Sequence, residues 1–156
     1  MHLTSKVPLG LVMAIGIMWS LASCDPTDDV GRRLGLWKEE GVVVEYLLCP
    51  DESVTRLELR RLTDNGPVLW EIEAPAGSSL QRFRLGVTPP GFVERSTLAA
   101  ELQEGVRYVV ELDSSRQVIA SNTFTLEELN NHDVLTSFDD EYMSQEDFLT
   151  QGEASC

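Results

Sequence analysis

The sequence predicts an all-β protein, a sandwich of about seven strands between an N-terminal signal peptide and an acidic C-terminal tail. Three observations lead to this prediction. Short apolar runs between residues 41 and 126 are separated about every 8 to 15 positions by turn residues such as Gly, Pro, Asn and Asp. Several runs alternate with the period of two that half-buried strands show. The chain begins with an apolar run and ends in acids.

The N-terminus has the layout of a signal peptide. Lys6 supplies the positive charge, residues 7–22 carry none, and the first acid is Asp25. A helix that crosses a membrane needs about 20 apolar residues to cover roughly 30 Å of hydrocarbon, and this run is shorter. We therefore expect an export signal rather than a spanning helix.

The apolar run ends in four residues that resemble the lipobox of bacterial lipoprotein precursors, namely Leu21, Ala22, Ser23 and Cys24. The resemblance implies that a diacylglycerol is attached to the Cys24 thiol and that residues 1–23 are removed. Two acyl chains are enough to hold a protein at a membrane. We expect residues 24–40 to form a lipidated tether on the extracytoplasmic side of a bacterial cell membrane. A plain secretory signal or a short uncleaved anchor is the alternative.

Two cysteines remain if Cys24 carries the lipid. Disulfides persist in exported proteins, so we expect a bridge between Cys49 and Cys156. The alternative is a buried Cys49 with Cys156 free. Two distant cysteines and the single mature histidine, His132, lack the spacing of a zinc site, and we expect neither a metal nor a cofactor.

The strands of the domain, expected over residues 41–126, follow from local patterns. The segment 106–112 alternates most clearly and predicts a half-buried strand. Two neighbouring arginines, Arg60 and Arg61, predict a bulge or an exposed edge where they lie. Six further segments are expected as strands: 41–49, 54–62, 68–73, 82–87, 98–102 and 117–126.

One local motif is spaced as Leu-x-x-Gly-x-x-Tyr-x-Val, and its residues are Leu102, Gly105, Tyr108 and Val110. It resembles the tyrosine corner of fibronectin type III and related immunoglobulin-like domains. The resemblance implies that Tyr108 begins the penultimate strand and that its hydroxyl bonds to the backbone a few residues upstream. Glu104 stands where the family often has Pro, and Trp70 falls on the third expected strand rather than the second. A core tyrosine in another β-fold is the alternative.

Residues 127–156 form the acidic tail. No basic residue follows Arg116, whereas nine acids do. The spacings of Ser137 with Asp140 and of Ser144 with Asp147 predict capped starts of short helices. Phe138 and Tyr142, four residues apart, with Phe148 and Leu149 further on, give a short helix an aromatic edge for the sandwich or a partner. We expect a solvated, partly ordered tail. The alternatives are a segment that folds on a basic partner and a calcium site at residues 139–141.

Composition narrows the function. The chain has 156 residues, enough for one domain, and a net charge of −14, which disfavours nucleic acid because its phosphates would be repelled. Catalysis is not expected: His132 has no recognisable nucleophile motif near it, and a secreted hydrolase is the least favoured alternative.

These observations favour a lipid-anchored envelope protein that presents a small sandwich to a protein or another envelope component. An accessory lipoprotein without a discrete ligand is the alternative. Candidate contacts are the sheet edges, through strand addition, together with Phe92 in a Pro-rich loop and the tail residues Phe138 and Tyr142.

Overall fold

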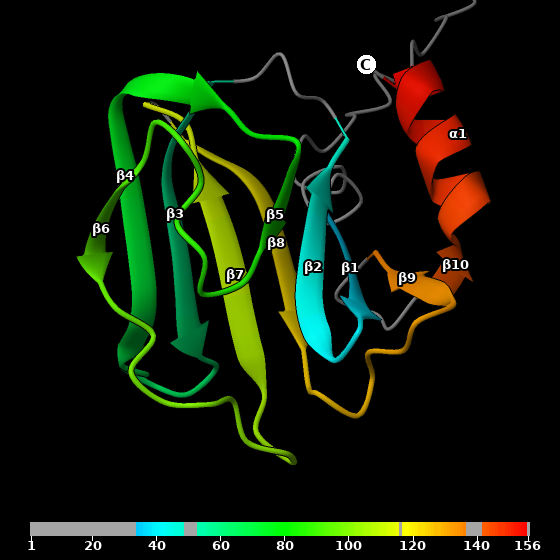
Figure 1. Cartoon of the computed structure of the whole chain (residues 1–156), viewed down its shortest axis with the longest axis horizontal. Helices are drawn as coiled ribbons and strands as arrows, with labels where there is room; N and C mark the ends of the chain where they lie inside the picture. Colours follow the sequence, from blue (N-terminus) through cyan, green and yellow to red (C-terminus); the bar gives the residue numbers. More distant parts are fainter. Residues whose placement is uncertain (1–33, 49–52, 116, 137–141, 156) are drawn as a thin grey trace, which may run out of the picture.

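The computed structural model describes residues 34–48, 53–115, 117–136 and 142–155. Within these residues, two antiparallel five-stranded sheets face each other, and one helix, α1 (Gln145–Ser155), stands beside the outer strands of the first sheet (Figure 1). The all-β prediction and the two-layer arrangement are therefore confirmed.

Sheet A has the strand order β10-β9-β1-β2-β5. Strands β1 and β2 form a hairpin. Its turn residues, Glu40 and Gly41, both have positive φ, 52° and 84°. Two such residues match the right-handed twist of the flanking strands. The strands of sheet A are β1 (Leu34–Glu39), β2 (Val42–Leu47), β5 (Arg82–Arg84), β9 (Asp133–Leu135) and β10 (Tyr142–Ser144).

Sheet B has the order β6-β4-β3-β7-β8, with β3 at its centre. A register shift between Leu59 and Arg60 confirms the expected bulge. The expectation of an exposed edge there is wrong, since β3 pairs with strands on both sides. The strands of sheet B are β3 (Ser53–Arg61), β4 (Val68–Ser79), β6 (Val93–Ser96), β7 (Tyr108–Asp113) and β8 (Val118–Phe124).

The described residues contain ten strands where about seven were expected. Strand β1 lies in the segment expected as tether, and β9 and β10 lie in the expected tail. The last two have three residues each, too few for alternation to mark them. The sheet therefore recruits segments on both sides of the predicted domain.

Two other expectations are corrected. Residues 98–102 form no strand; Leu98 and Leu102 instead pack against the core from a loop, and β6 pairs with β4 in their place. Strand β4 also continues beyond the expected segment 68–73, as far as Ser79. Between β3 and β4 the paired residues change from Arg56↔Glu73 to Val54↔Ser78. Pro75 and Gly77 therefore lie in a bulge of β4, where their backbone is not required to form hydrogen bonds with β3.

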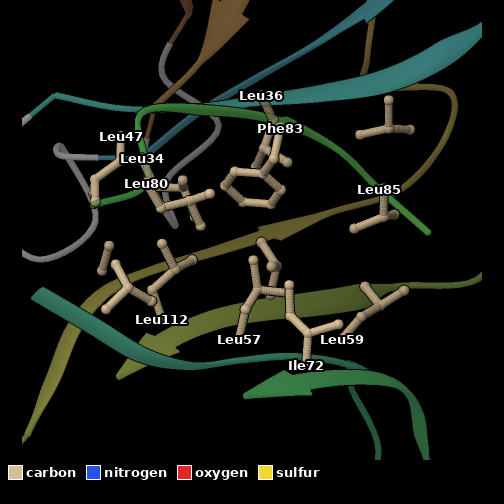
Figure 2. Close-up of a cluster of buried hydrophobic side chains, with 14 of the residues drawn as sticks. Leu34, Leu36, Leu47, Leu57, Leu59, Ile72, Leu80, Phe83, Leu85 and Leu112 are labelled. Carbon is tan, nitrogen blue, oxygen red and sulfur yellow. The ribbon is translucent and has the colours of Figure 1, made fainter. Parts of the chain in front are cut away.

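The core fills the space between the sheets. Figure 2 shows Leu36, Phe83 and Leu85 pointing from the sheet A side toward Leu57, Ile72, Leu59 and Leu112 of sheet B. Phe92 belongs to the same core and is only 8% exposed, which counts against its expected role as a partner contact. The N–H of Phe92 donates to the carbonyl of Pro89, and this turn directs the ring inward, where its apolar area leaves water.

Two buried polar side chains secure this core. Tyr108 begins β7, and its hydroxyl accepts a 2.8 Å hydrogen bond from the N–H of Gln103, five residues upstream. Asn122 of β8 is fully buried and donates to the carbonyls of Leu34 (3.0 Å) and Leu135 (2.9 Å), which belong to the opposite sheet. Asn122 thus joins the two sheets at their shared side.

Candidate functional site

The structure scatters the residues predicted as sites. Cys24, Cys49, Cys156 and Phe138 lie outside the described residues, so the lipid site, the disulfide and one contact stay predictions. Tyr142 is 44% exposed on β10, at the edge of sheet A, whereas Phe92 is buried in the core. No surface on the described part of the chain joins these two aromatic residues.

Helix α1 begins after Ser144, one of the two predicted cap positions. Ser137 and Asp140 lie outside the described residues, and Tyr142, expected on the edge of a helix, lies in strand β10 instead. The Ser144 hydroxyl accepts the N–H of Asp147 at 3.1 Å and donates to the Asp147 carboxylate at 2.7 Å. This reciprocal pair satisfies one of the free N–H groups at the helix start, and the acids Glu146 and Asp147 complement its dipole. The helix therefore begins at a fixed point directly after β10.

Phe148 attaches the helix to the outer face of sheet A. Its side chain is 2% exposed and forms a second, smaller core with Trp37, Val44 and Val134. Gly35 makes this contact possible, since a Cβ on that residue would lie 2.6 Å from the Phe148 ring and 2.5 Å from Val134. The space left by the absent side chain of Gly35 is filled by the Phe148 ring, which fixes helix α1 on the sheet.

The aromatic side chains continue across the sheet toward β5. Phe148 meets Tyr46 edge-on, with ring centroids 6.3 Å apart, and Tyr46 lies 6.4 Å from Trp37. Such separations suit favourable pairs of rings. The Tyr46 hydroxyl accepts a 2.7 Å hydrogen bond from the Gln81 side chain, which holds its ring in place.

A hollow of about 260 Å³ opens where the helix stops covering this face. We call it the aromatic groove. Its floor and walls come from β1, β2, β5, β9 and α1, through Trp37, Glu39, Tyr46, Arg82, Val134, Gln145, Phe148 and Leu149. Leu149 is 41% exposed at its margin. The groove thus combines aromatic surface with an amide, an acid and a guanidinium.

Another hollow, of about 300 Å³, also has Arg82 in its lining. We call it the arginine hollow, and its lining is Arg82, Phe83, Arg84, Val87, Thr88, Pro89 and Pro90. Val87 is 56% exposed there. Because Arg82 lines both spaces, the two hollows adjoin the same short strand, β5.

The two arginines of β5 share one carboxylate. A guanidinium nitrogen of Arg82 lies 2.5 Å from a Glu39 oxygen, and one of Arg84 lies 3.9 Å from the same oxygen. Both side chains are at least half exposed. One acid cannot neutralise two guanidinium groups, so this edge carries excess positive charge on a chain whose net charge is −14.

An unpartnered carboxyl lies on the inner side of the same sheet. Glu45 of β2 is fully buried, opposite Leu36 on one side and Phe83 on the other. Neither of its oxygens has a hydrogen-bond partner among the described residues. Burial raises the pKa of Glu45 well above its ordinary value, because the charged form loses its hydration.

The outer face of sheet B is charged and internally paired. Arg56 contacts Glu58 (3.3 Å), Glu71 (3.8 Å) and Asp113 (2.8 Å), while Arg60 contacts Glu58 and Glu111. Glu71, Glu58 and Glu111 lie opposite one another across three strands, an arrangement that would repel without the arginines. These charges hold one another in place.

Other chemistry finds little support on the described part of the chain. No group of three or more His, Cys, Asp or Glu side chains suits a metal ion there. Within the same residues, no helix has the length and apolar character that a membrane crossing requires. His132 is exposed in the turn before β9, where Asn130 accepts its backbone N–H.

Comparison with known proteins gives no relative: no protein-family model, curated protein or solved structure matches the chain. The groove must therefore be understood from its own residues.

The sequence predicted one part of this groove and missed the rest. The apolar edge of the tail helix was expected, and Phe148 confirms it. Trp37 was missed because its strand was expected as tether, and Arg82 because an exposed arginine in a strand has no distinctive pattern. A lone charge at position 45, between Val43 and Leu47 on an apolar face, was the available signal for Glu45.

Proposed function

We propose that the chain is a lipid-anchored binding module of the bacterial envelope, held by Cys24 and built on an immunoglobulin-like or fibronectin type III-like sandwich. The lipobox residues at positions 21–24 support the anchor. The aromatic groove, with its positively charged edge, is the observation that carries the binding role. The sandwich presents that groove on the extracytoplasmic side.

The strand pairing supports the immunoglobulin-like type. In that fold, strands A, B and E share one sheet and strands C, F and G share the other. Here β1, β2 and β5 are neighbours in sheet A, and β3, β7 and β8 are neighbours in sheet B, in the same chain order. The Tyr108 hydroxyl bond to Gln103 at the start of β7 has the geometry of a tyrosine corner.

The elements beyond this arrangement support binding at sheet A. Strands β9 and β10 and helix α1 extend one side of sheet A only. They bring Phe148, Leu149 and Gln145 over the outer face of the sheet and so create one wall of the groove. Without these elements Trp37 and Tyr46 would lie on an open, flat sheet surface with no groove.

The anchor is tested by the mass of the mature protein. Protein isolated from its own cells should carry a diacylglyceryl group on Cys24 as its first residue and should fractionate with membranes. A Cys24→Ser variant should lack the lipid and leave the membrane fraction. An unmodified N-terminus in the native protein would refute the anchor.

The binding role is tested by crosslinking in cells followed by mass spectrometry. Leu149→Asp places a charge at the groove margin, and Val93→Asp, on the edge of the other sheet, is the control with a similarly exposed side chain. We expect one dominant neighbour, lost with Leu149→Asp and kept with Val93→Asp. No reproducible neighbour would instead indicate an accessory lipoprotein without a ligand.

A further inference from the structure

Strand β5 presents backbone hydrogen-bonding groups as well as positive charge at the edge of sheet A. It is the last strand of sheet A, and the N–H of Leu47 donates to Gln81 while the N–H of Leu85 donates to Val43. In an antiparallel ladder these bonds turn the backbone of alternate residues toward the neighbour. The N–H and C=O of Arg82, and the N–H of Arg84, therefore point away from β2, toward the free edge.

The other sheet edges are less suited to binding an added strand. At the β8 side, Asn122 bonds across to β1 and β9, and β10 lies against helix α1. Strand β6 carries Glu94 beside Arg95, and Arg95 is paired with Glu73 at 2.7 Å. Only at β5, among the described edges, do an outward backbone, unbalanced positive charge and two adjoining hollows coincide.

The positive charge of β5 favours a negatively charged partner. Arginines on an edge strand repel a second copy of the same edge, which protects the free protein against self-association. The same side chains attract an incoming strand that carries carboxylates opposite them, because guanidinium and carboxylate groups form paired hydrogen bonds. An anionic polysaccharide could meet the charge but has no amide groups to continue the ladder.

We infer that an acidic peptide segment of the partner binds as an added strand along the edge of β5. Its backbone pairs with the outward N–H and C=O groups of Arg82 and the N–H of Arg84. Its carboxylates lie on the outer face beside the two guanidinium groups, and its intervening side chains point to the opposite face, the side of Phe83. This inference rests on the proposed binding function, because it names the chemistry of that partner. Peptides of this kind bind by main-chain hydrogen bonds, with side chains giving specificity.

The test is fluorescence anisotropy with full-length protein purified from membranes in detergent. The probes are labelled peptides of about six residues that alternate Glu and Val, a Lys and Val counterpart, and a Glu and Val peptide N-methylated on the amides of one edge. We expect binding of the first peptide only, weakened by salt. Competition by polygalacturonate without an effect of N-methylation would overturn strand addition, since charge alone would then suffice.

Variants locate the site. Arg82→Gln with Arg84→Gln removes both charges without reversing them, and we expect at least about tenfold weaker peptide binding. Arg95→Gln, on the edge of the other sheet, is the matched control and should bind as the native protein does. Circular dichroism verifies that each variant is folded. Equal loss with the control would overturn the assignment to β5.

The outcome separates the two proposals. If the peptide does not bind while Leu149→Asp still abolishes the neighbour found in cells, strand addition is wrong and the binding module stands. If the peptide fails and no neighbour is found, the proposed function fails as well. Concentration-dependent dimerisation that is lost in the Arg82→Gln, Arg84→Gln protein would overturn the inference in favour of a second copy.

Discussion

The outer faces of the two sheets differ in how their charged and aromatic groups are arranged. The outer face of sheet B carries rows of acids and arginines that pair with one another, from Asp113 and Arg56 to Arg60 and Glu111. The outer face of sheet A is aromatic, is covered by a helix only in part, and carries an arginine pair with a single acid. Among the described residues, buried polar atoms without a hydrogen-bond partner occur in both sheets, at Glu45 in sheet A and at Arg61 and Trp70 in sheet B.

The difference indicates where binding is to be expected. Groups that are fully paired within a protein gain little from a ligand, because each new contact replaces an existing one. Groups left partly unmatched, as on sheet A, gain more when a partner arrives. The charged groups on the outer face of sheet B accordingly hold one another in place, and the outer face of sheet A is where we expect a partner to bind.

The largest expected effect is the loss of the helix anchor on sheet A. Phe148→Ala empties the site above Gly35 and should lower the free energy of unfolding by about 3 to 5 kcal/mol, measured by urea denaturation. Leu149→Ala, at the exposed neighbouring position, is the control and should cost much less. Similar losses in both variants would contradict the role of Phe148 as anchor.

The next effect concerns the polar residue that joins the sheets. Asn122→Ala leaves the carbonyls of Leu34 and Leu135 without their donor in a buried place, and should cost about 3 kcal/mol in the same assay. Ser121→Ala, one position away on the outer face, provides the comparison. A cost for Asn122→Ala below that of Ser121→Ala would show that the bridge contributes nothing.

Glu45 should behave in the opposite sense to Asn122. Glu45→Leu removes an unpartnered carboxyl from the core and should raise the stability at neutral pH by about 1 to 2 kcal/mol. The denaturation midpoint in urea of both proteins gives the difference. Glu94→Leu, at an exposed position, should leave the stability nearly unchanged.

The same carboxyl predicts a pH dependence. Below its ordinary pKa, Glu45 keeps its proton in the folded and the unfolded chain, so its burial costs least there. Above that pH the unfolded chain loses the proton while the folded chain retains it, because burial raises the folded pKa. Stability should therefore fall with rising pH until the folded pKa is passed, and Glu45→Leu should lack this part of the decline.

The smallest effect is expected on the paired face of sheet B. Arg56→Gln breaks three ion pairs at a side chain that is 40% exposed, and should cost no more than about 1 kcal/mol. The cost should shrink in high salt, as measured by denaturation at two ionic strengths. A loss as large as that of Phe148→Ala would overturn the view that this face is only a charged frame.

The sequence predicted sheet B better than sheet A for a physical reason. Strands β3, β4 and β7 have at least six residues and one charged face, so alternation marks them. Strand β1 contains Gly35 at the helix contact, ends in Lys38 and Glu39, and directly follows the mostly polar residues 25–33 of the expected tether. The three residues of β9 are too short for any periodic signal, whereas β5 lies within the segment 82–87 that alternation predicted as a strand.

The groove was beyond prediction because its residues meet only in the folded chain. Trp37, Tyr46, Arg82 and Phe148 come from four elements spread over the described sequence. In the sequence each looks like an ordinary core aromatic residue or exposed arginine. They line one groove only because the fold brings them together. The capping pair of Ser144 and Asp147, which is local, was predicted correctly.

The most direct test of the binding role of sheet A is photocrosslinking in living cells from two single positions. A photoreactive amino acid replaces Leu149, at the margin of the aromatic groove, or Glu94, on the edge of sheet B. We expect a single strong adduct with one envelope protein from position 149 and none from position 94. Adducts of equal strength from both positions, or from position 94 alone, would contradict the assignment of the binding surface to sheet A.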